Sequence, residues 1–505
     1  MNTNIRTCCL CVLLLSLLNF PSQYTNAQTT DAPNVIIINV DDLGYGDLSI
    51  YGATEIKTPN IDALAEQGVR FTNGHATSAT CTPSRYALIT GEYPWRQDAK
   101  ILPGDAALII STDKTTVPAL FQQAGYATGI VGKWHLGLGE TTEKNWNRPI
   151  SPGPNEVGFD YSFIFPATAD RVPTVFMENG GVLGLEENDP ITVNYQQPVG
   201  DDPTGATNPE LLKMPASPNH GHNNTIVNGV GRIGYMSGGH KARWTDEEVP
   251  LTFLMKAKEF IEANQREPFF LYYALTEPHV PRMPSTVFKG KSKLGYRGDA
   301  ILQIDWAVGE VMKQLKALGI EEKTMIIFTS DNGPVLDDGY VDYAVEKNGT
   351  HQPAGPLRGG KYSAFEGGTR VPLIISWPGT IKPAVSDALV CQVDFLASFS
   401  ELIDQRIPNN QATDSENLLS VFLGQSQKGR DVLIKQGGAM TVTKGNWKYI
   451  SPQAGAAVAK LTNIETGNST EEQLYNLKED LGEQNNIAEQ YPDKVMEMKS
   501  ALSDF

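Results

Sequence analysis

The chain has 505 residues, of which 40% are hydrophobic and 20% charged, a globular composition that excludes an extended disordered protein. A chain of this length buries about three quarters of its unfolded surface and usually divides into more than one core. The formal net charge of -17 and the pI of about 4.9 exclude a basic surface for nucleic acid or an anionic membrane. A polyanionic substrate would therefore need a local cationic pocket.

The first residues have the pattern of an export signal. Arg6 is the only charged residue before an apolar run at residues 8–18, and the small residues Thr25 and Ala27 follow a polar stretch. The run is shorter than the roughly 20 residues that a membrane-spanning helix needs, and the pattern is typical of a cleaved signal peptide. A buried N-terminal helix is the alternative. We predict a signal peptide at residues 1–27 and a periplasmic or secreted protein, whose net charge changes from -17 to -18 with the loss of Arg6.

Removal of this signal would leave two of the five cysteines, Cys81 and Cys391. An exported chain of this length with two widely separated cysteines is not a disulfide scaffold. The two could form a single disulfide with each other, or Cys81 could serve the chemistry of a site.

The remaining elements alternate between strands and helices along the chain. Continuous apolar runs at residues 34–42, 268–279 and 324–333 predict strands that are buried on both faces. Helical periodicity occurs between them, at residues 58–67, 117–124, 251–264 and 299–318. This alternation predicts an α/β fold, with a mostly parallel sheet covered by helices on both faces.

Two regions depart from this pattern. Residues 139–244 are rich in Gly, Pro and Asn and have weak periodicity, which predicts a long insertion that shapes a binding cleft. From about residue 408 the chain changes to short strand-like pieces and ends in a helix near residues 491–502. We expect a main α/β domain at residues 28–407 and a small α+β subdomain at residues 408–505.

Two of the predicted strands end in adjacent side chains that carry oxygen. Asp41 and Asp42 close the first strand, and Asp331 and Asn332 close the third. In open α/β sheets, ligands bind beyond the carboxyl ends of the strands. Three carboxylates and an amide, without Cys or His nearby in sequence, favour Ca²⁺ or Mg²⁺ over Zn²⁺. Of the two, Ca²⁺ is the first candidate. The alternative is that these residues only cap turns.

The segment ATCTPSRYALITG contains a Cys-x-Pro-x-Arg core formed by Cys81, Pro83 and Arg85, followed by the apolar start of a helix. This segment resembles the signature of the type I sulfatases, within the alkaline-phosphatase-like superfamily. GYATGIVGKWH, at residues 125–135, resembles the second signature of that family. The likeness covers almost the whole mature chain, including NVIIINVDDLGYGDL, TSDNG, LRGGKYSAFEGGTRVP and QLYNLKEDLGEQNNIA in this order. Together these motifs are highly specific.

The resemblance implies an alkaline-phosphatase-like fold with a sulfatase catalytic domain at residues 28–407. It implies a nucleophile formed when a formylglycine-generating maturation enzyme oxidises Cys81 to Cα-formylglycine. An aldehyde hydrate offers two geminal hydroxyls, of which one attacks sulfur and the other later expels the sulfate, so the hydrolysis divides into two easier steps. A Ca²⁺ ion would neutralise charge that develops on the sulfuryl group. The implied ligands are Asp41, Asp42, Cys81 in its modified form, Asp331 and Asn332.

The other catalytic roles also come from the resemblance. Arg85 lies one helical turn after Cys81 and would steady the hydrate. Lys133 and Lys361 would contact the sulfate, and His135 would hydrogen-bond the hydrate. His279, at the end of a predicted strand, would protonate the leaving alcohol together with Lys361. Taken alone, each lysine could be a solvated side chain and each histidine a satisfied residue of the core.

The segments at residues 165–180 and 232–244 resemble the branch that acts on sulfated sugars, including galactose- and N-acetylgalactosamine-6-sulfatase-like enzymes. Asp170 and Arg171 would then bind a sugar hydroxyl through charge-assisted hydrogen bonds, and a local ion pair is the alternative. His220 and His222 have the spacing of metal ligands but no evident third ligand, which favours a loop role or a substrate contact. The length and the small number of cysteines favour a bacterial enzyme that degrades polysaccharides.

Two other functions fit part of the sequence. A phosphoesterase of the same superfamily would use a Ser or Thr nucleophile and a two-metal site with histidine ligands, and the Cys-x-Pro-x-Arg core argues against it. An inactive glycan-binding homologue would be expected to have lost Cys81, Lys133, His279 or Lys361, and all four are present. The sequence therefore predicts an exported, calcium-dependent sulfatase that acts on a sulfated carbohydrate.

Overall fold

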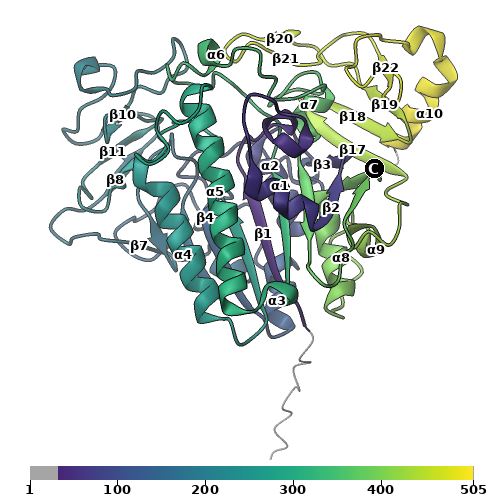
Figure 1. Cartoon of the computed structure of the whole chain (residues 1–505). Helices are drawn as coiled ribbons and strands as arrows, with labels where there is room; N and C mark the ends of the chain where they lie inside the picture. The colour runs from purple at the N-terminus through teal and green to yellow at the C-terminus, as the bar shows by residue number, and fades with distance from the viewer. Residues whose placement is uncertain (1–31, 504–505) are drawn as a thin grey trace, which may run out of the picture.

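A computed structural model describes residues 32–503, so the predicted signal peptide lies outside the described residues. Ten strands form one sheet in the order β15-β2-β14-β13-β1-β12-β4-β5-β6-β7 (Figure 1). The five central strands run parallel. They are β13 (Thr324–Ser330), β1 (Asn34–Val40), β12 (Phe269–Ala274), β4 (Ala127–Lys133) and β5 (Tyr161–Phe165). The outer strands are β15 (Ala384–Ser386), β2 (Gly68–Phe71), β14 (Leu373–Ser376), β6 (Met177–Glu178) and β7 (Gly181–Val182).

Strand β1 shows why the sheet lies between two layers of helices. Successive side chains of a strand point to opposite faces, and here Val35 and Ile37 enter one core whereas Ile36 and Ile38 enter the other. A continuous run of branched apolar residues is therefore buried only when both faces are covered. The first core includes α2 (Cys81–Thr90), α3 (Val117–Gln123), α8 (Phe395–Leu402) and α9 (Leu419–Phe422). The second includes α1 (Pro59–Glu66), α4 (Val249–Ala263) and α5 (Gly295–Leu318).

The predicted α/β fold and its four helices are confirmed, but the apolar run at residues 268–279 is not a single strand. Strand β12 ends at Ala274, opposite Asn39 of β1. The chain then enters a loop that contains Pro278 and Pro281, and proline has no N–H to donate to a central ladder. His279 was predicted to end a strand, but it lies in this loop instead.

The region at residues 139–244 is only partly an insertion. Its first part supplies β5, β6 and β7 to the main sheet, because the apolar run of β5 pairs in parallel with β4. The rest forms two small antiparallel pairs. These are β8 (Thr192–Asn194) with β11 (Tyr235–Ser237), and β9 (Ile226–Val227) with β10 (Val230–Gly231). Figure 1 shows them at the left of the molecule, beyond α4.

The C-terminal unit is a four-stranded antiparallel sheet with α10 (Pro492–Ser503) packed against it, which confirms the predicted small α+β subdomain. Its strands are β17 (Val432–Gly437), β18 (Ala439–Lys444), β19 (Trp447–Ile450) and β22 (Gln473–Asn476). The subdomain was predicted to start at residue 408. Val421 and Phe422 nevertheless pack in the main core, so part of the chain after residue 408 belongs to that core. Short elements complete the chain: β3 (Gly74–His75), β16 (Val390–Cys391), β20 (Val458–Ala459), β21 (Ile464–Glu465), α6 (Ala344–Lys347) and α7 (Glu366–Thr369).

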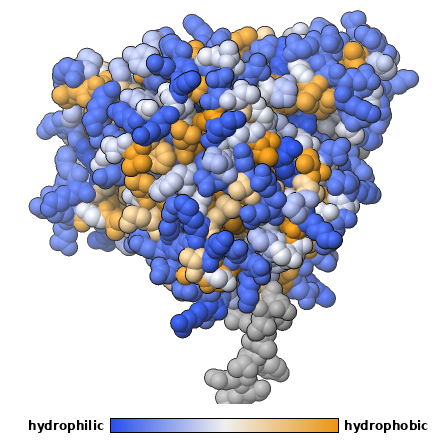
Figure 2. Space-filling model, in the orientation of Figure 1, coloured by the Kyte–Doolittle hydropathy of each residue, from blue (hydrophilic) through white to orange (hydrophobic). Residues whose placement is uncertain are grey.

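One face of the molecule is largely polar. Hydrophilic residues predominate on the face shown in Figure 2, and hydrophobic ones form small groups. Among residues 32–503, no helix combines the length and apolar character needed to cross a membrane.

Buried ions join the small sheet to the main domain. Lys448 of β19 lies 2.8 Å from Glu483 and 3.1 Å from Glu366 of α7, and Lys435 of β17 lies 2.8 Å from Glu366. All four side chains are almost completely buried. Ions buried away from water are tolerated only when they are paired, so this cluster fixes the small sheet to α7 of the main domain.

Replacing Lys448 with Met should therefore lower the free energy of unfolding by about 3–5 kcal/mol, because two buried carboxylates would lose the ammonium between them. The midpoint of urea unfolding measures this. Lys444→Met is the matched control, since Lys444 lies on the adjacent strand, is 41% exposed and pairs with Glu497 at 2.8 Å. An exposed pair contributes about 0–1 kcal/mol. Equal shifts in the two variants would contradict a special role for the buried cluster.

Candidate active site

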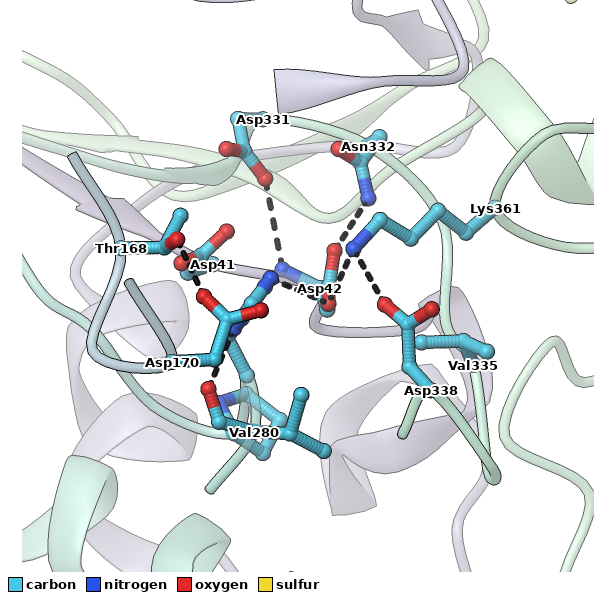
Figure 3. Close-up of polar contacts among 12 residues, drawn as sticks. Asp41, Asp42, Thr168, Asp170, Val280, Asp331, Asn332, Val335, Asp338 and Lys361 are labelled. Atoms are coloured by element: carbon cyan, nitrogen blue, oxygen red, sulfur yellow. Dashed lines mark hydrogen bonds and ion pairs between the residues drawn. The ribbon is translucent and has the colours of Figure 1, made fainter. Parts of the chain in front are cut away.

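The predicted site residues meet where the central strands end. Strands β1 and β13 are parallel, with Val40 opposite Ser330. This register places Asp41 and Asp42, which follow β1, beside Asp331 and Asn332, which follow β13 (Figure 3). Parallel strands present their carboxyl ends at the same edge of a sheet, and β4, which is separated from β1 by β12, contributes Lys133 at that edge. The loop after β12 contributes His279.

Asp42 lies at the centre of this group. Asn332 Nδ2 donates to Asp42 Oδ1 at 2.7 Å, and the Asp42 N–H donates to Asp331 Oδ1 at 3.3 Å. Asp42 has a φ of 62°, in the left-handed region that non-glycine residues rarely adopt. Such conformations persist where the surrounding contacts fix them, often at functional sites.

Three cations face the carboxylates. Lys133 Nζ lies 2.7 Å from Asp41 Oδ2, and Lys361 Nζ lies 2.9 Å from Asp42 Oδ2. Arg85 reaches Asp331 Oδ2 through Nε at 2.9 Å and Nη2 at 2.8 Å. Burial opposes ionisation of Asp42, but Lys361, His279 and Lys133 outweigh it and lower the pKa of this carboxyl. The site therefore contains the local cationic groups that the acidic net charge of the chain requires.

Cys81 is the first residue of α2 and is 2% exposed. Burial raises the pKa of its thiol, and the charges of Lys133, Lys361 and Asp41 also act on it, so the thiol lies among these groups. Cys81 and Cys391 are both free, which excludes the alternative of a disulfide between them.

Two histidines border the same group. His135 has a left-handed φ of 55°, and its Nε2 lies 2.9 Å from the Leu102 carbonyl, so this nitrogen carries the hydrogen. Burial and Lys133 lower the pKa of His135 well below its ordinary value. His279 Nδ1 lies 2.7 Å from the Val280 carbonyl, and its Nε2 is 3.8 Å from Asp42. Burial, followed by the charge of Lys361, lowers the pKa of His279 to about 3.

Asp170 and Arg171 lie beside this centre. Asp170 Oδ1 accepts from Arg171 Nη1 at 3.0 Å and from Thr168, so the local ion pair is present. The positive charge of Arg171 contributes to the low pKa of His135, and His279 contributes to the low pKa of Asp170, which indicates that the pair borders the pocket.

The two histidines of the NHGHNN segment separate in the structure. His222 Nε2 lies 3.0 Å from Asp170 Oδ2, whereas His220 Nε2 lies 3.1 Å from the Leu461 carbonyl. Within residues 32–503, the group of acidic, histidine and cysteine side chains close enough to share a metal is Asp41, Asp42 and His279. The two histidines therefore do not form a metal site with each other.

Asp338 belongs to the site but was not predicted. Its Oδ2 accepts from Lys361 Nζ at 2.8 Å, and its Oδ1 accepts from the Tyr362 hydroxyl at 3.1 Å (Figure 3). An Asp-Asp-Gly sequence between two apolar residues is an ordinary turn signal, so nothing in the sequence distinguishes this carboxylate from a solvated one.

The centre fits a hard cation. Asp41 Oδ1 and Asn332 Oδ1 are buried and have no hydrogen-bond partner, and such atoms usually have one. Asp41, Asp42 and His279 offer ligand atoms that all lie within 4.8 Å of one another. The oxygen-rich group of side chains suits Ca²⁺, and the His279 ring lies beside it, with Nε2 3.8 Å from Asp42 Oδ2.

Comparisons with known proteins agree with this geometry. Residues 33–405 match the sulfatase family. An N-acetylgalactosamine-6-O-sulfatase of Bacteroides thetaiotaomicron is 51% identical over 97% of this chain and 96% of its own length. Human arylsulfatase A is 31% identical over 79% of this chain and 70% of its own length.

Solved structures show the same fold. A sulfatase from a glycosaminoglycan-metabolising locus of B. thetaiotaomicron, with 51% identity, superposes with a TM-score of 0.92 over 94% of this chain and 99% of its own. A phosphonate monoester hydrolase of Agrobacterium radiobacter, with 17% identity, has a TM-score of 0.56 over 94% and 95% and shares the fold alone. The fold therefore also occurs in a hydrolase that is not a sulfatase. The match to the sulfatase family and the sulfatase that is 51% identical over almost its full length are specific for sulfate ester hydrolysis. The chain belongs to the sulfatase family and is a sulfuric ester hydrolase.

Proposed function

We propose that this enzyme removes sulfate from a sulfated carbohydrate, with a 6-O-sulfated galactose or N-acetylgalactosamine unit as the first candidate. The observation that carries the proposal is the position of Asp170 and Arg171 beside the cationic pocket that holds Lys133 and Lys361. A carboxylate and a guanidinium form strong, directional hydrogen bonds with sugar hydroxyls. The relative that is 51% identical is an N-acetylgalactosamine-6-O-sulfatase, which supports this choice of sugar.

The charges of the pocket suit a monoanionic sulfate ester. In their ionised forms Asp41, Asp42, Asp331 and Asp338 carry four negative charges, and Arg85, Lys133 and Lys361 carry three positive charges. With a divalent cation the total becomes one positive charge, equal and opposite to that of a sulfate ester. Lys133 and Lys361 would bind the sulfate oxygens as point charges, and the surrounding burial would strengthen that attraction.

We further propose that Asp41, Asp42, Asp331 and Asn332 hold a Ca²⁺ ion, which would act as a Lewis acid on the sulfuryl group. The buried oxygens of Asp41 and Asn332 that lack a hydrogen-bond partner support this assignment. A Cα-formylglycine made from Cys81 would supply the nucleophilic hydroxyl. The complete Cys-x-Pro-x-Arg core and the place of Cys81 among the charged groups support it.

Departure of the alcohol needs a proton donor. His279 and Lys361 approach the same oxygen of Asp42, at 3.8 and 2.9 Å, so the two side chains are neighbours on one side of the centre. This arrangement supports their proposed joint role in protonating the leaving oxygen, with Lys361 as the source of the proton, because the low pKa of His279 leaves that ring neutral. Arg85 and His135 would orient the nucleophile from α2 and from the end of β4.

Export and maturation are part of the same proposal. The pattern of residues 1–27 favours export. Because Cys81 is 2% exposed once the chain has folded, a formylglycine-generating enzyme would have to act before folding is complete.

Protein produced together with a maturation enzyme should carry formylglycine at position 81, and mass spectrometry of the peptide that contains Cys81 should show the loss of sulfur. Cys81→Ala should abolish turnover, because no hydroxyl could attack sulfur, while the urea unfolding midpoint stays the same. Full activity in protein whose Cys81 is an unmodified thiol would overturn this assignment.

Removal of divalent metal by a chelator should inactivate the enzyme, because the pocket would lose the charge that balances its carboxylates. Added Ca²⁺ should restore the rate, and elemental analysis should find calcium in stoichiometric amount. Stoichiometric zinc without calcium would contradict the oxygen-rich assignment.

The proposed substrate is tested by sulfate release from a panel of sulfated monosaccharides and oligosaccharides, with an aryl sulfate and a phosphate monoester for comparison. We expect the highest kcat/KM with a 6-O-sulfated galactose or N-acetylgalactosamine. The double variant Asp170→Ala/Arg171→Ala removes the pair together, so that neither charge is left buried alone. Loss of a charge-assisted hydrogen bond of about 1.5–3 kcal/mol lowers kcat/KM on the sugar by roughly 10- to 150-fold.

The same double variant should change aryl sulfate hydrolysis much less, because a non-sugar ester makes no contact with the pair. A parallel fall on both substrates would show that the pair supports the catalytic centre instead. No fall on either substrate would show that the sugar binds elsewhere.

A further inference from the structure

His222 is directed at the proposed sugar-binding pair. It lies in the region at residues 139–244, is 6% exposed, and places Nε2 3.0 Å from Asp170 Oδ2. An ionised carboxylate only accepts hydrogen bonds, so Nε2 carries the hydrogen and His222 is the donor. The other Asp170 oxygen contacts Thr168 and Arg171. Together these contacts fix the orientation of the carboxylate.

The ring of His222 is itself tightly held. Tyr340 packs edge-on against it, with 4.8 Å between the ring centroids, and the Tyr340 hydroxyl donates to the Gly231 carbonyl at 2.7 Å. Gly339 has a φ of 129° and lies directly against the imidazole. A Cβ atom at that position would be 2.2 Å from Cε1 and 2.4 Å from Nδ1 of His222. Only glycine leaves room for the ring to reach Asp170.

The segment that holds His222 also contacts the sulfate side of the pocket. Asp338, immediately before Gly339, accepts from Lys361 at 2.8 Å. Asp337 accepts from Ser217 at 2.8 Å and so ties this segment to the loop that leads to His222. The same short stretch, residues 337–340, therefore contacts both Lys361 and the histidine that binds Asp170.

We propose that His222 is a positioning residue for sugar recognition: it donates from Nε2 to Asp170 and thereby directs the remaining lone pairs of that carboxylate toward a hydroxyl of the sulfated sugar. The inference rests on the proposed carbohydrate sulfatase function. The low exposure of His222 argues against a broad contact of its own with substrate. It also lies outside the group of side chains in residues 32–503 that are close enough to share a metal.

The test compares His222→Leu, which removes the donor, with His222→Gln, whose amide Nε2 can take the place of the imidazole Nε2. On the best sugar substrate, His222→Leu should lower kcat/KM about tenfold or more, as expected for a lost hydrogen bond to a charged group. His222→Gln should restore most of the loss. Hydrolysis of an aryl sulfate and the inhibition constant of inorganic sulfate should change less than twofold, because the sulfate pocket is not altered.

Two further variants complete the design. His220→Gln is the matched control, since His220 belongs to the same loop but bonds to the Leu461 carbonyl, and its activity on the sugar should equal that of the wild type. His222→Asn keeps a polar side chain, but its shorter amide takes the place of Nδ1 and not of Nε2, so it cannot reach Asp170 and should reproduce the selective loss on the sugar. This variant carries the test if His222→Leu does not fold.

Three results would overturn the inference: an equal fall on sugar and aryl substrates, no fall on either, or a loss in His222→Gln as large as in His222→Leu. The activity of the wild-type enzyme on the two kinds of substrate distinguishes failure of this inference from failure of the proposed function. If the wild type hydrolyses the aryl ester but none of the sulfated sugars, the proposed function fails and the inference with it. If the wild type hydrolyses a sulfated sugar and the variants do not respond as expected, only the inference fails.

Discussion

The parallel register of β1 and β13 is the constraint on which the rest of the site depends. With Val40 opposite Ser330, the residues that follow must bring Asp41 and Asp42 against Asp331. Like charges in a buried, low-dielectric environment repel strongly, so this arrangement is stable only with compensating cations. Arg85 and Lys133 supply two of them at hydrogen-bond distance. The same concentration of charge suits the proposed metal ion and an anionic sulfate ester.

Each compensating charge comes from a different part of the fold. Arg85 lies on α2, Lys133 ends β4, and Lys361 lies in a loop before α7. That loop is held from two sides, since the Tyr362 N–H donates to the Ala79 carbonyl at 2.8 Å and the Ser363 hydroxyl donates to the Glu465 carbonyl at 2.6 Å. The C-terminal subdomain is therefore part of the support of the catalytic centre.

The specificity side of the pocket is built differently. Residues 139–244 have few long elements, and a buried ion pair holds the backbone beside Asp170. Arg232 is completely buried, binds Asp246 through two hydrogen bonds of 2.9 and 2.6 Å, and donates to the Ala169 carbonyl at 2.7 Å. This anchors the backbone next to Asp170. Buried polar contacts of this kind restrict a loop to one geometry, which the proposed recognition of a sugar would require.

The sequence by itself determined the α/β class, the buried central strands and the residues that converge at their ends, because apolar periodicity and short motifs are local properties. It also indicated Asp170 and Arg171, through the likeness to a family. Only the tertiary structure decided that β12 stops at Ala274, that β5 extends the main sheet, and that Asp338 and His222 belong to the site. The physical reason is that Asp338 and His222 act through partners distant in the chain, at Lys361 and Asp170, and no local pattern records such a contact.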